Sequence, residues 1–175
     1  MKPLITVAIP EEISASFHSR VHFTGIGILN SLLSLSCLSY KPSIVYNIGT
    51  CVSKYPHDTV AVEFSNFISS VKSFPHPPIS FSDNFNDFNI MKSSDFLETH
   101  FEFVTSPHQM SSLYGDMEVY AQATFCKHHS IPFRCFKVIS DCAQSTSQSH
   151  WEDQLEITRP ILDKLIKYII SIENI

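Results

Sequence analysis

The segment Asp116–Ala143, DMEVYAQATFCKHHSIPFRCFKVISDCA, decides the fold class of this chain. Within it, Phe133–Ile139 is an almost unbroken apolar run, which is typical of a strand buried on both faces of a parallel sheet. The preceding residues, Asp116–His129, have a helical pattern. A helix that leads into a buried strand is typical of βαβ units, so this segment predicts an α/β fold.

The rest of the chain alternates in the same way. We predict strands at Leu4–Ile9, Arg20–Thr24, Ser43–Ile48, Thr59–Phe64 and His100–Val104, and helices at Ile28–Leu38 and Glu152–Ile170. Residues Ser73–Asn89 contain three prolines and repeated Ser, Asn and Asp, which predicts a loop. The alternation predicts one domain, residues 1–175, built as a three-layer α/β sandwich with a mixed, mainly parallel sheet flanked by helices.

Composition excludes several classes of protein. The 175 residues are 43% hydrophobic, which is enough for a buried core. Their formal net charge of −5 argues against a nucleic-acid partner, which normally requires a basic face. No apolar run reaches the roughly 20 residues of a membrane span, and the first residues are typical of a strand rather than a signal peptide. We therefore expect a cytoplasmic protein with no membrane partner. Five cysteines without a CxxC pair predict reduced, mostly buried thiols.

Ligands of open α/β sheets bind at the carboxyl ends of the strands, so the residues that follow each strand are candidates. The predicted strands are followed by Glu11-Glu12, by the turn Gly25-Ile26-Gly27, by Gly49-Thr50 and by Ser140-Asp141. Glu118 begins the predicted helix after Gly115. Taken singly, Asp141 is also typical of a helix cap, Glu118 of a first helical turn, and Glu11-Glu12 of a solvated pair.

Three carboxylates that meet in one pocket suit hydrolysis of a glycosidic bond. One carboxyl group protonates the leaving group, a second polarises a water molecule, and negative charge stabilises the oxocarbenium-like transition state. Glu12, Glu118 and Asp141 are the candidates for these roles.

Other chemistries lack their motifs. The Gly25-x-Gly27 turn has no third glycine and no acidic residue at the distance that dinucleotide binding requires, and no GxSxG is present. His128 and His129 are adjacent on a predicted helix and point to different faces, so they do not chelate one metal ion. We expect no metal and no cofactor. Trp151, the only tryptophan, is expected either to pack in the core or to stack on a flat ligand.

In combination, these motifs resemble the nucleoside phosphorylase/nucleosidase superfamily. The resemblance rests on the Met117-Glu118 pair that opens a helix, on the Pro-Phe strand that ends in Ile-Ser-Asp about twenty residues later, and on the stretches VAIPEEI, FTGIGILNS and VYNIGT. It is strongest with the hydrolytic branch, the methylthioadenosine/S-adenosylhomocysteine nucleosidases and futalosine hydrolases. It spans both ends of the chain and implies a nucleoside phosphorylase-like fold.

The resemblance also implies roles for individual residues. Asp141 would donate a proton to N7 of the purine, and Glu12 would position and activate water. The expected substrate-binding residues are Glu118 at the ribose hydroxyls, Met117 and Trp151 against the nucleoside, Ser140 holding the Asp141 carboxyl, and Ile26 and Gly49 at the Gly-Ile-Gly turn and the strand end.

The departures from the family pattern leave alternatives open. The chain is some tens of residues shorter than typical members, Lys137 replaces the arginine before Ile-Ser-Asp, and Val104–Gln109 does not match the base-binding segment closely. The expected substrate is a 5′-modified purine nucleoside, namely methylthioadenosine, S-adenosylhomocysteine or a futalosine compound of menaquinone biosynthesis. An aspartate facing N7 favours adenine as the leaving base. The resemblance implies a homodimer. The alternatives are a non-catalytic nucleoside-binding or interaction protein and a phosphate-dependent phosphorylase.

Overall fold

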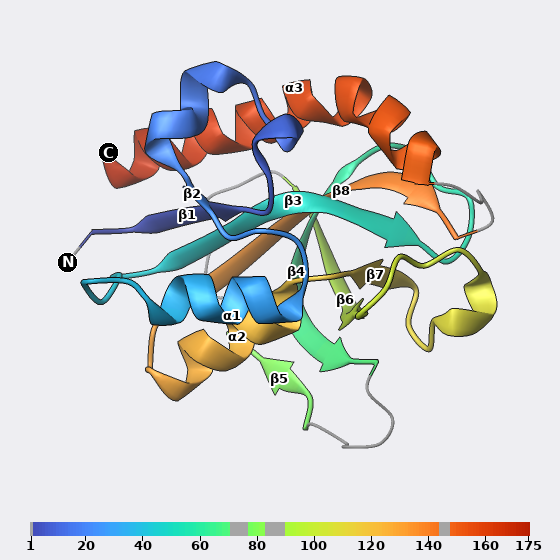
Figure 1. Cartoon of the computed structure of the whole chain (residues 1–175), viewed down its shortest axis with the longest axis horizontal. Helices are drawn as coiled ribbons and strands as arrows, with labels where there is room; N and C mark the ends of the chain where they lie inside the picture. Colours follow the sequence, from blue (N-terminus) through green and yellow to red (C-terminus); the bar gives the residue numbers. More distant parts are fainter. Residues whose placement is uncertain (1, 71–76, 83–89, 144–147) are drawn as a thin grey trace.

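The computed structural model describes residues 2–70, 77–82, 90–143 and 148–175. Its strands are β1 Leu4–Val7, β2 His22–Phe23, β3 Val45–Ser53, β4 Ala61–Ser69, β5 Ile79–Ser80, β6 Met91–Thr99, β7 Tyr114–Asp116 and β8 Phe133–Cys142. The helices are α1 Ile28–Ser36, α2 Val119–His128 and α3 Gln148–Glu173, and short 3₁₀ turns lie at Pro10–Glu12, Ala15–Arg20 and Pro107–Gln109. The alternation confirms the predicted α/β class (Figure 1).

The strands form one mixed sheet that curls back on itself. Strands β2, β1, β3 and β8 run parallel, and β4 pairs antiparallel with β8. Strand β6 then pairs parallel with β4 and with β7, and β7 pairs antiparallel with β3. The pairings β3–β8–β4–β6–β7–β3 therefore close into a ring. The sheet is mixed and mainly parallel, as predicted, but its barrel-like closure differs from the flat central layer of a three-layer sandwich.

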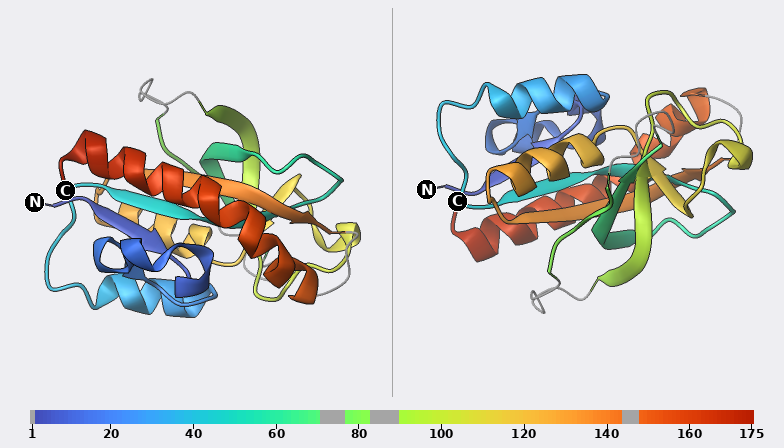
Figure 2. Two further views of the ribbon diagram at one scale, coloured as in Figure 1. Left: turned by 90° about the horizontal axis from the view of Figure 1, so that it is seen from above. Right: turned by 90° about the horizontal axis from the view of Figure 1, so that it is seen from below.

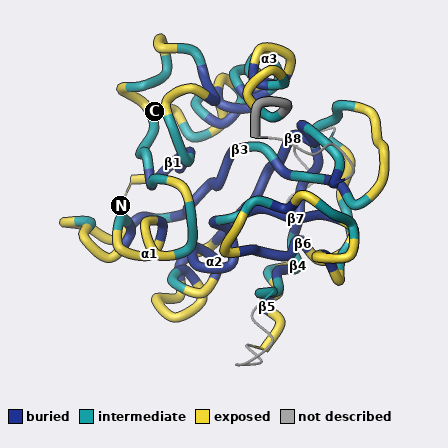
Figure 3. The backbone as a smooth tube through the Cα atoms, turned by 45° about the vertical axis from the view of Figure 1, so that its right-hand side comes forward, coloured by how far each residue is buried: buried dark blue, intermediate teal, exposed yellow. Residues whose placement is uncertain are grey.

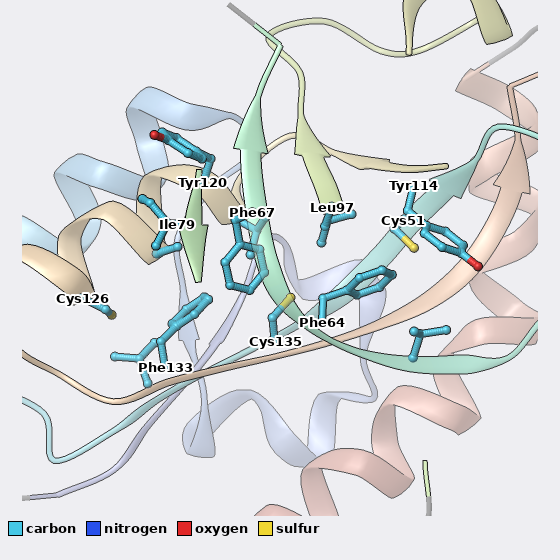
Figure 4. Packing of buried hydrophobic residues seen from close by; sticks show 14 of the residues in the cluster. Cys51, Phe64, Phe67, Ile79, Leu97, Tyr114, Tyr120, Cys126, Phe133 and Cys135 are labelled. Carbon is cyan, nitrogen blue, oxygen red and sulfur yellow. The ribbon is translucent and has the colours of Figure 1, made fainter. Parts of the chain in front are cut away.

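Helices cover the sheet on two sides, as predicted (Figures 1 and 2). Helix α3 packs on β8 and β3, and its apolar face joins a buried cluster that includes Ile5, Tyr46, Phe136, Leu162 and Ile166. Helices α1 and α2 pack together on the other side. There, a second buried cluster fills the space between α2 and the curled strands; it includes Phe64, Phe67, Leu97, Tyr114 and Phe133 (Figure 4). Burial is concentrated in the strands other than the first part of β6, whereas most exposed residues lie on turns and outer helix faces (Figure 3).

Several predicted element bounds are wrong. His100–Val104 is not a strand, because β6 ends at Thr99 and the chain bends away. Strands β6 and β7 were not predicted: the first half of β6, MKSS, is polar and largely exposed, and β7 has only three residues. Most of the predicted loop Ser73–Asn89 lies outside the described residues, and its described part contains β5.

The two ends of the chain carry smaller differences. Helix α3 begins at Gln148, so Trp151 lies inside the helix rather than before it. The five cysteines are free thiols, and Cys51, Cys126 and Cys135 are buried, as expected for structural thiols. In the described ranges, no helix is long and apolar enough to cross a membrane.

Candidate active site

A cavity of about 250 Å³ lies at the carboxyl ends of β3 and β8. All eight residues singled out from the sequence line it: Glu12, Ile26, Gly49, Met117, Glu118, Ser140, Asp141 and Trp151. They come from the turn after β1, the turn before α1, strand β3, the start of α2, the end of β8 and the first turn of α3. The fold therefore brings together side chains that are more than a hundred residues apart in the sequence.

Glu12 is a buried carboxylate at the floor of this cavity. Its Oε1 accepts hydrogen bonds from the backbone N of Thr50 (3.1 Å) and from Thr50 Oγ1 (3.2 Å). Its Oε2 accepts a bond from the backbone N of Ala8 (3.2 Å). Burial raises the pKa of Glu12, while the Lys137 charge and the Thr50 bonds act in the opposite direction.

Gly49 explains how Glu12 and Lys137 both reach the cavity floor. A Cβ at position 49 would lie 3.2 Å from Glu12 Oε1 and 3.4 Å from Lys137 Nζ. A larger side chain would therefore displace the carboxylate, the ammonium group or both. Gly49 lies in the middle of β3, which continues to Ser53 instead of ending at Ile48 as predicted, and its lack of a side chain allows these two charged groups to approach the backbone.

Lys137 supplies the cation of the site. Its side chain is almost fully buried in β8, and its Nζ lies 3.0 Å from Asp116 Oδ2. Burial alone would lower the pKa of Lys137, but the Asp116 carboxylate, together with Glu118 and Glu12, raises it well above the usual value. Lys137 is therefore charged at all physiological pH values.

Asp116 holds its position through two further bonds. Its Oδ1 accepts a bond from Thr99 Oγ1 (2.7 Å), and its Oδ2 accepts one from the backbone N of Val119 in the first turn of α2 (2.9 Å). The Lys137–Asp116 pair thus ties β8 to β6, to β7 and to the N-terminus of α2.

Glu118 connects α2 to the turn before α1. Its Oε1 accepts a bond from the backbone N of Gly27 at 2.8 Å, and its side chain is buried. Burial and the neighbouring Asp116 charge raise the pKa of Glu118 to about 7, although Lys137 acts against them. Near neutral pH, Glu118 therefore exists in both protonation states. It is the N-cap residue of α2 rather than part of its first turn.

Asp141 lies within β8, one residue before its end, and α3 begins seven residues later. The helix-cap alternative for Asp141 is therefore wrong. Its Oδ1 accepts a bond from Ser140 Oγ at 2.6 Å, and Ser140 Oγ also lies 3.3 Å from the carbonyl oxygen of Cys51. Ser140 thus fixes the carboxyl group at the cavity wall.

One wall of the cavity is aromatic and apolar. The rings of Phe103 and Trp151 meet edge to face, with centroids 6.1 Å apart and planes at 71°. Both line the cavity, as do Val104 and Met117. Such a wall suits a flat, uncharged ring, and the same cavity is lined by the carboxylates.

The sequence pattern missed some residues of this site. Asp116 pairs with Lys137, and Phe103 contacts Trp151. Thr50 was a candidate at a strand end but was given no role, and it bonds to Glu12. Asp116 stands directly beside Met117, so its position next to a motif was an available signal. Phe103 had no such signal, because it lies in a segment wrongly predicted as a strand. In the described part of the chain, no three His, Cys, Asp or Glu side chains are arranged to hold a metal ion.

Comparison with known proteins gives one curated relative and many solved structures. No protein-family model matches the chain. The 5′-methylthioadenosine/S-adenosylhomocysteine nucleosidase of Buchnera aphidicola subsp. Schizaphis graminum is 27% identical over 181 aligned positions, which cover 85% of this chain and 77% of that protein.

The solved structures agree in fold. A futalosine hydrolase mutant of Helicobacter pylori superimposes with a TM-score of 0.77 at 15% identity, covering 98% of this chain and 99% of that one. The H. pylori 5′-methylthioadenosine/S-adenosylhomocysteine nucleosidase with butyl-thio-DADMe-Immucillin-A gives 0.77 at 16% identity, covering 98% of each chain. This chain is thus a relative of the methylthioadenosine/S-adenosylhomocysteine nucleosidases in sequence, and it has the fold that they share with futalosine hydrolase.

Proposed function

We propose that this protein is a purine nucleosidase that hydrolyses the N-glycosidic bond of a 5′-modified purine nucleoside and releases the free base. The observation that carries the proposal is the convergence of Glu12, Glu118 and Asp141, from three separate elements, on one cavity with an aromatic wall. A pocket that only binds a nucleoside has no need for three buried or half-buried carboxyl groups around one space.

Asp141 is the general acid of the proposed reaction. Its protonated carboxyl group donates a proton to N7 of the base, which makes the base a better leaving group as the glycosidic bond breaks. Ser140 holds this carboxyl group through the 2.6 Å bond to Oδ1. The ring pair Phe103–Trp151 and the residue Met117 provide the surface on which base and sugar pack.

Glu12 is the general base. Its ionised carboxylate accepts a proton from water as the water attacks C1′ of the sugar. The charge of Lys137 and the bonds from Thr50 favour the ionised form, and they counter the effect of burial. Glu118 accepts hydrogen bonds from the ribose hydroxyls, and its negative charge stabilises the oxocarbenium-like transition state.

The substrate class follows from the comparisons. We propose an adenine nucleoside with a 5′ substituent, such as methylthioadenosine, S-adenosylhomocysteine or aminodeoxyfutalosine, because the relatives are named for these classes of compound.

We further propose a cytoplasmic protein whose residues 1–175 act as one domain. Finally, we propose a homodimer, because exposed Leu29 and Leu33 of α1 continue the apolar surface beyond Ile26 at the cavity edge.

Release of the free base tests the function. Purified protein is incubated in phosphate-free buffer with methylthioadenosine, S-adenosylhomocysteine, aminodeoxyfutalosine or futalosine, and adenine or hypoxanthine is measured by chromatography. We expect release from at least one nucleoside. Asp141→Asn should lower the rate at least about 100-fold, since general-acid catalysis contributes about 10² to 10⁴. Asp153→Asn, at an exposed carboxylate of α3, is the matched control and should retain the full rate.

The same experiment separates the alternatives. Base release that requires added phosphate and yields a sugar phosphate would show a phosphorylase. No release with or without phosphate, together with nucleoside binding by calorimetry, would show a binding protein. A fully active and well-folded Asp141→Asn variant would overturn the assignment of the general acid.

A further inference from the structure

A chain of hydrogen bonds links the only tryptophan to the buried carboxylate Glu12. Trp151 Nε1 donates to Thr50 Oγ1 at 3.0 Å, and Thr50 Oγ1 lies 3.2 Å from Glu12 Oε1. The three residues come from α3, β3 and the 3₁₀ turn after β1, and all three line the cavity. Thr50 and Trp151 are each half-buried, so the chain lies at the boundary between the cavity floor and the solvent.

The direction of these bonds is fixed by the chemistry of the groups. An indole N–H only donates, and a threonine hydroxyl carries one hydrogen and two lone pairs. Once Thr50 Oγ1 accepts the indole hydrogen, its own hydrogen is free to point to Glu12, and an ionised carboxylate accepts it. The hydroxyl therefore stabilises the charged form of Glu12, and the indole holds the hydroxyl in place.

We propose that Trp151 is a positioning residue that acts through Thr50 to keep Glu12 ionised and correctly oriented. The proposal deepens the nucleosidase function and rests on it for its consequence in catalysis, but the contact itself can be tested without activity. It assigns to the indole N–H a task separate from packing of the ring on a nucleoside.

Other groups around Glu12 do not replace this bond. Lys137 on β8 and Glu118 at the start of α2 interact with Glu12 only electrostatically, through their charges. On α3, Arg159 donates to the carbonyl oxygen of Glu11 at 2.8 Å, and Asp163 accepts from Ser14, so both hold the backbone on either side of Glu12. In the described residues, both hydrogen bonds to Glu12 Oε1 come from Thr50.

The same indole also contacts the aromatic wall. Its edge-to-face contact with Phe103 makes Trp151 part of the surface proposed for the base, while its N–H is bonded to Thr50, which contacts the carboxylate proposed for water activation. A base that packs against this wall would restrict the indole ring. Binding of the leaving group would thereby stabilise the bond that orients Thr50 toward Glu12.

The first test uses the single indole N–H as a probe. Because the chain has one tryptophan, its ¹H–¹⁵N spectrum contains one indole cross-peak. We expect this peak to shift with pH as Glu12 is protonated. The shift should be lost in Glu12→Gln and retained in Glu118→Gln, which removes a neighbouring buried carboxyl group whose pKa is also raised. A peak that is insensitive to Glu12→Gln would overturn the proposal, whether or not the protein hydrolyses a nucleoside.

The second test measures the catalytic consequence. Trp151→Phe keeps an aromatic ring but removes the donor, and Thr50→Val removes the hydroxyl. We expect both to move the acid limb of the kcat/KM profile upward by about 1 to 2 pH units, the scale of one hydrogen bond to a charged group. The double variant should show no further shift, since both changes break the same chain.

Two controls separate positioning from packing. Thr50→Ser keeps the hydroxyl, so the acid limb of its pH profile should stay at the wild-type position. Phe103→Leu removes the ring contact but leaves the indole N–H, so it should raise KM without moving the limb. If Trp151→Phe leaves the limb in place while Thr50→Val moves it, the indole has no positioning role. If no variant or wild-type protein releases a base, the proposed function fails while the spectroscopic result still decides the contact.

Discussion

At the scale of single residues, the site is defined by one buried cation among several carboxyl groups. Lys137 stands where the sequence resemblance led us to expect an arginine, and an ammonium group has a different geometry from a planar guanidinium. Here it lies 3.0 Å from Asp116 and balances the charges of Glu12 and Glu118. An unpaired charge is costly to bury, so each of these groups depends on the others.

Removing the cation tests this dependence. Lys137→Met keeps most of the side-chain volume and leaves Asp116 buried without its partner. We expect a loss of about 3 to 5 kcal/mol in the free energy of unfolding, measured by urea denaturation. Lys137→Met combined with Asp116→Asn should recover a large part of this loss. Equal stability of the wild type and the single variant would contradict the paired arrangement.

Glu118 gives a prediction on pH. Its pKa of about 7 in the folded protein lies above the usual value of 4.5, so the folded state binds a proton more tightly than the unfolded state. The contribution of this group to stability is therefore fully present below about pH 4.5 and is lost as the pH rises through about 7. The free energy of unfolding should therefore fall between pH 5 and pH 8. Glu118→Gln should make this fall smaller by about 1 to 3 kcal/mol, measured from denaturation midpoints. An unchanged slope would mean that other groups cause the decline.

At the scale of elements, Glu98 at the end of β6 holds the loop that borders the cavity. Its carboxylate accepts bonds from Ser111 N (2.7 Å), Ser111 Oγ (2.9 Å) and Ser112 N (2.9 Å). The loop follows β6 from His100 onward, and its residues Phe103 and Val104 line the cavity. His100 Nε2 lies 3.7 Å from Oε2 of the same carboxylate. Glu98 thus fixes, from the end of β6, the loop that carries Phe103 of the aromatic wall.

Weakening this anchor should affect substrate binding more than chemistry. Glu98→Gln keeps the shape but replaces charge-assisted bonds with neutral ones. We expect a rise of several-fold in KM with kcat within about two-fold, and a loss of about 1 to 2 kcal/mol in stability. Asp95→Asn, at an exposed carboxylate of the same strand, is the control and should change neither. A lower kcat at constant KM would contradict this prediction, because it would show that Glu98 affects the chemical step and not substrate binding.

At the scale of the whole molecule, α1 presents an unusual apolar surface. Leu29 is 67% exposed and Leu33 is 53% exposed, and they lie four residues apart on one helix face. They continue from Ile26, which lines the cavity and is 43% exposed. A second copy of the chain placed here would bury this surface next to the cavity.

A paired substitution tests this homodimer. Leu29→Glu with Leu33→Glu should convert a dimer into a monomer in light scattering, because it places like charges in the contact. Activity should fall if the partner completes the site. Ile172→Glu, on the exposed face of α3, is the control and should leave the dimer intact. A wild-type monomer at working concentration would contradict the proposal.

Much of the fold could be predicted because its main strands carry strong local signals. Phe133–Ile139 lies inside β8, and the predicted helices at residues 28–38, 116–129 and 152–170 correspond to α1, α2 and α3. The strands that failed are those without such a signal. Strand β6 is buried only at its last three residues, so its polar first half gave no alternation to detect.

The sequence predicted eight residues that line the cavity, but it did not predict the contacts between them. Glu12, Glu118 and Asp141 follow from their positions at strand and helix ends, which depend on the local sequence. The Lys137–Asp116 pair and the bonds from Thr50 to Glu12 join residues from different elements, so no spacing along the chain indicates them.

The sequence by itself determined the α/β class, the order of the main elements and eight of the residues that line the cavity, because local hydrophobic pattern and motif position carry that information. Only the tertiary structure decided that the sheet closes through β4 and β8, that Trp151 reaches Glu12 through Thr50, and that Glu118 titrates near neutral pH. These features depend on distances between distant segments and on burial, and both are set when the whole chain packs.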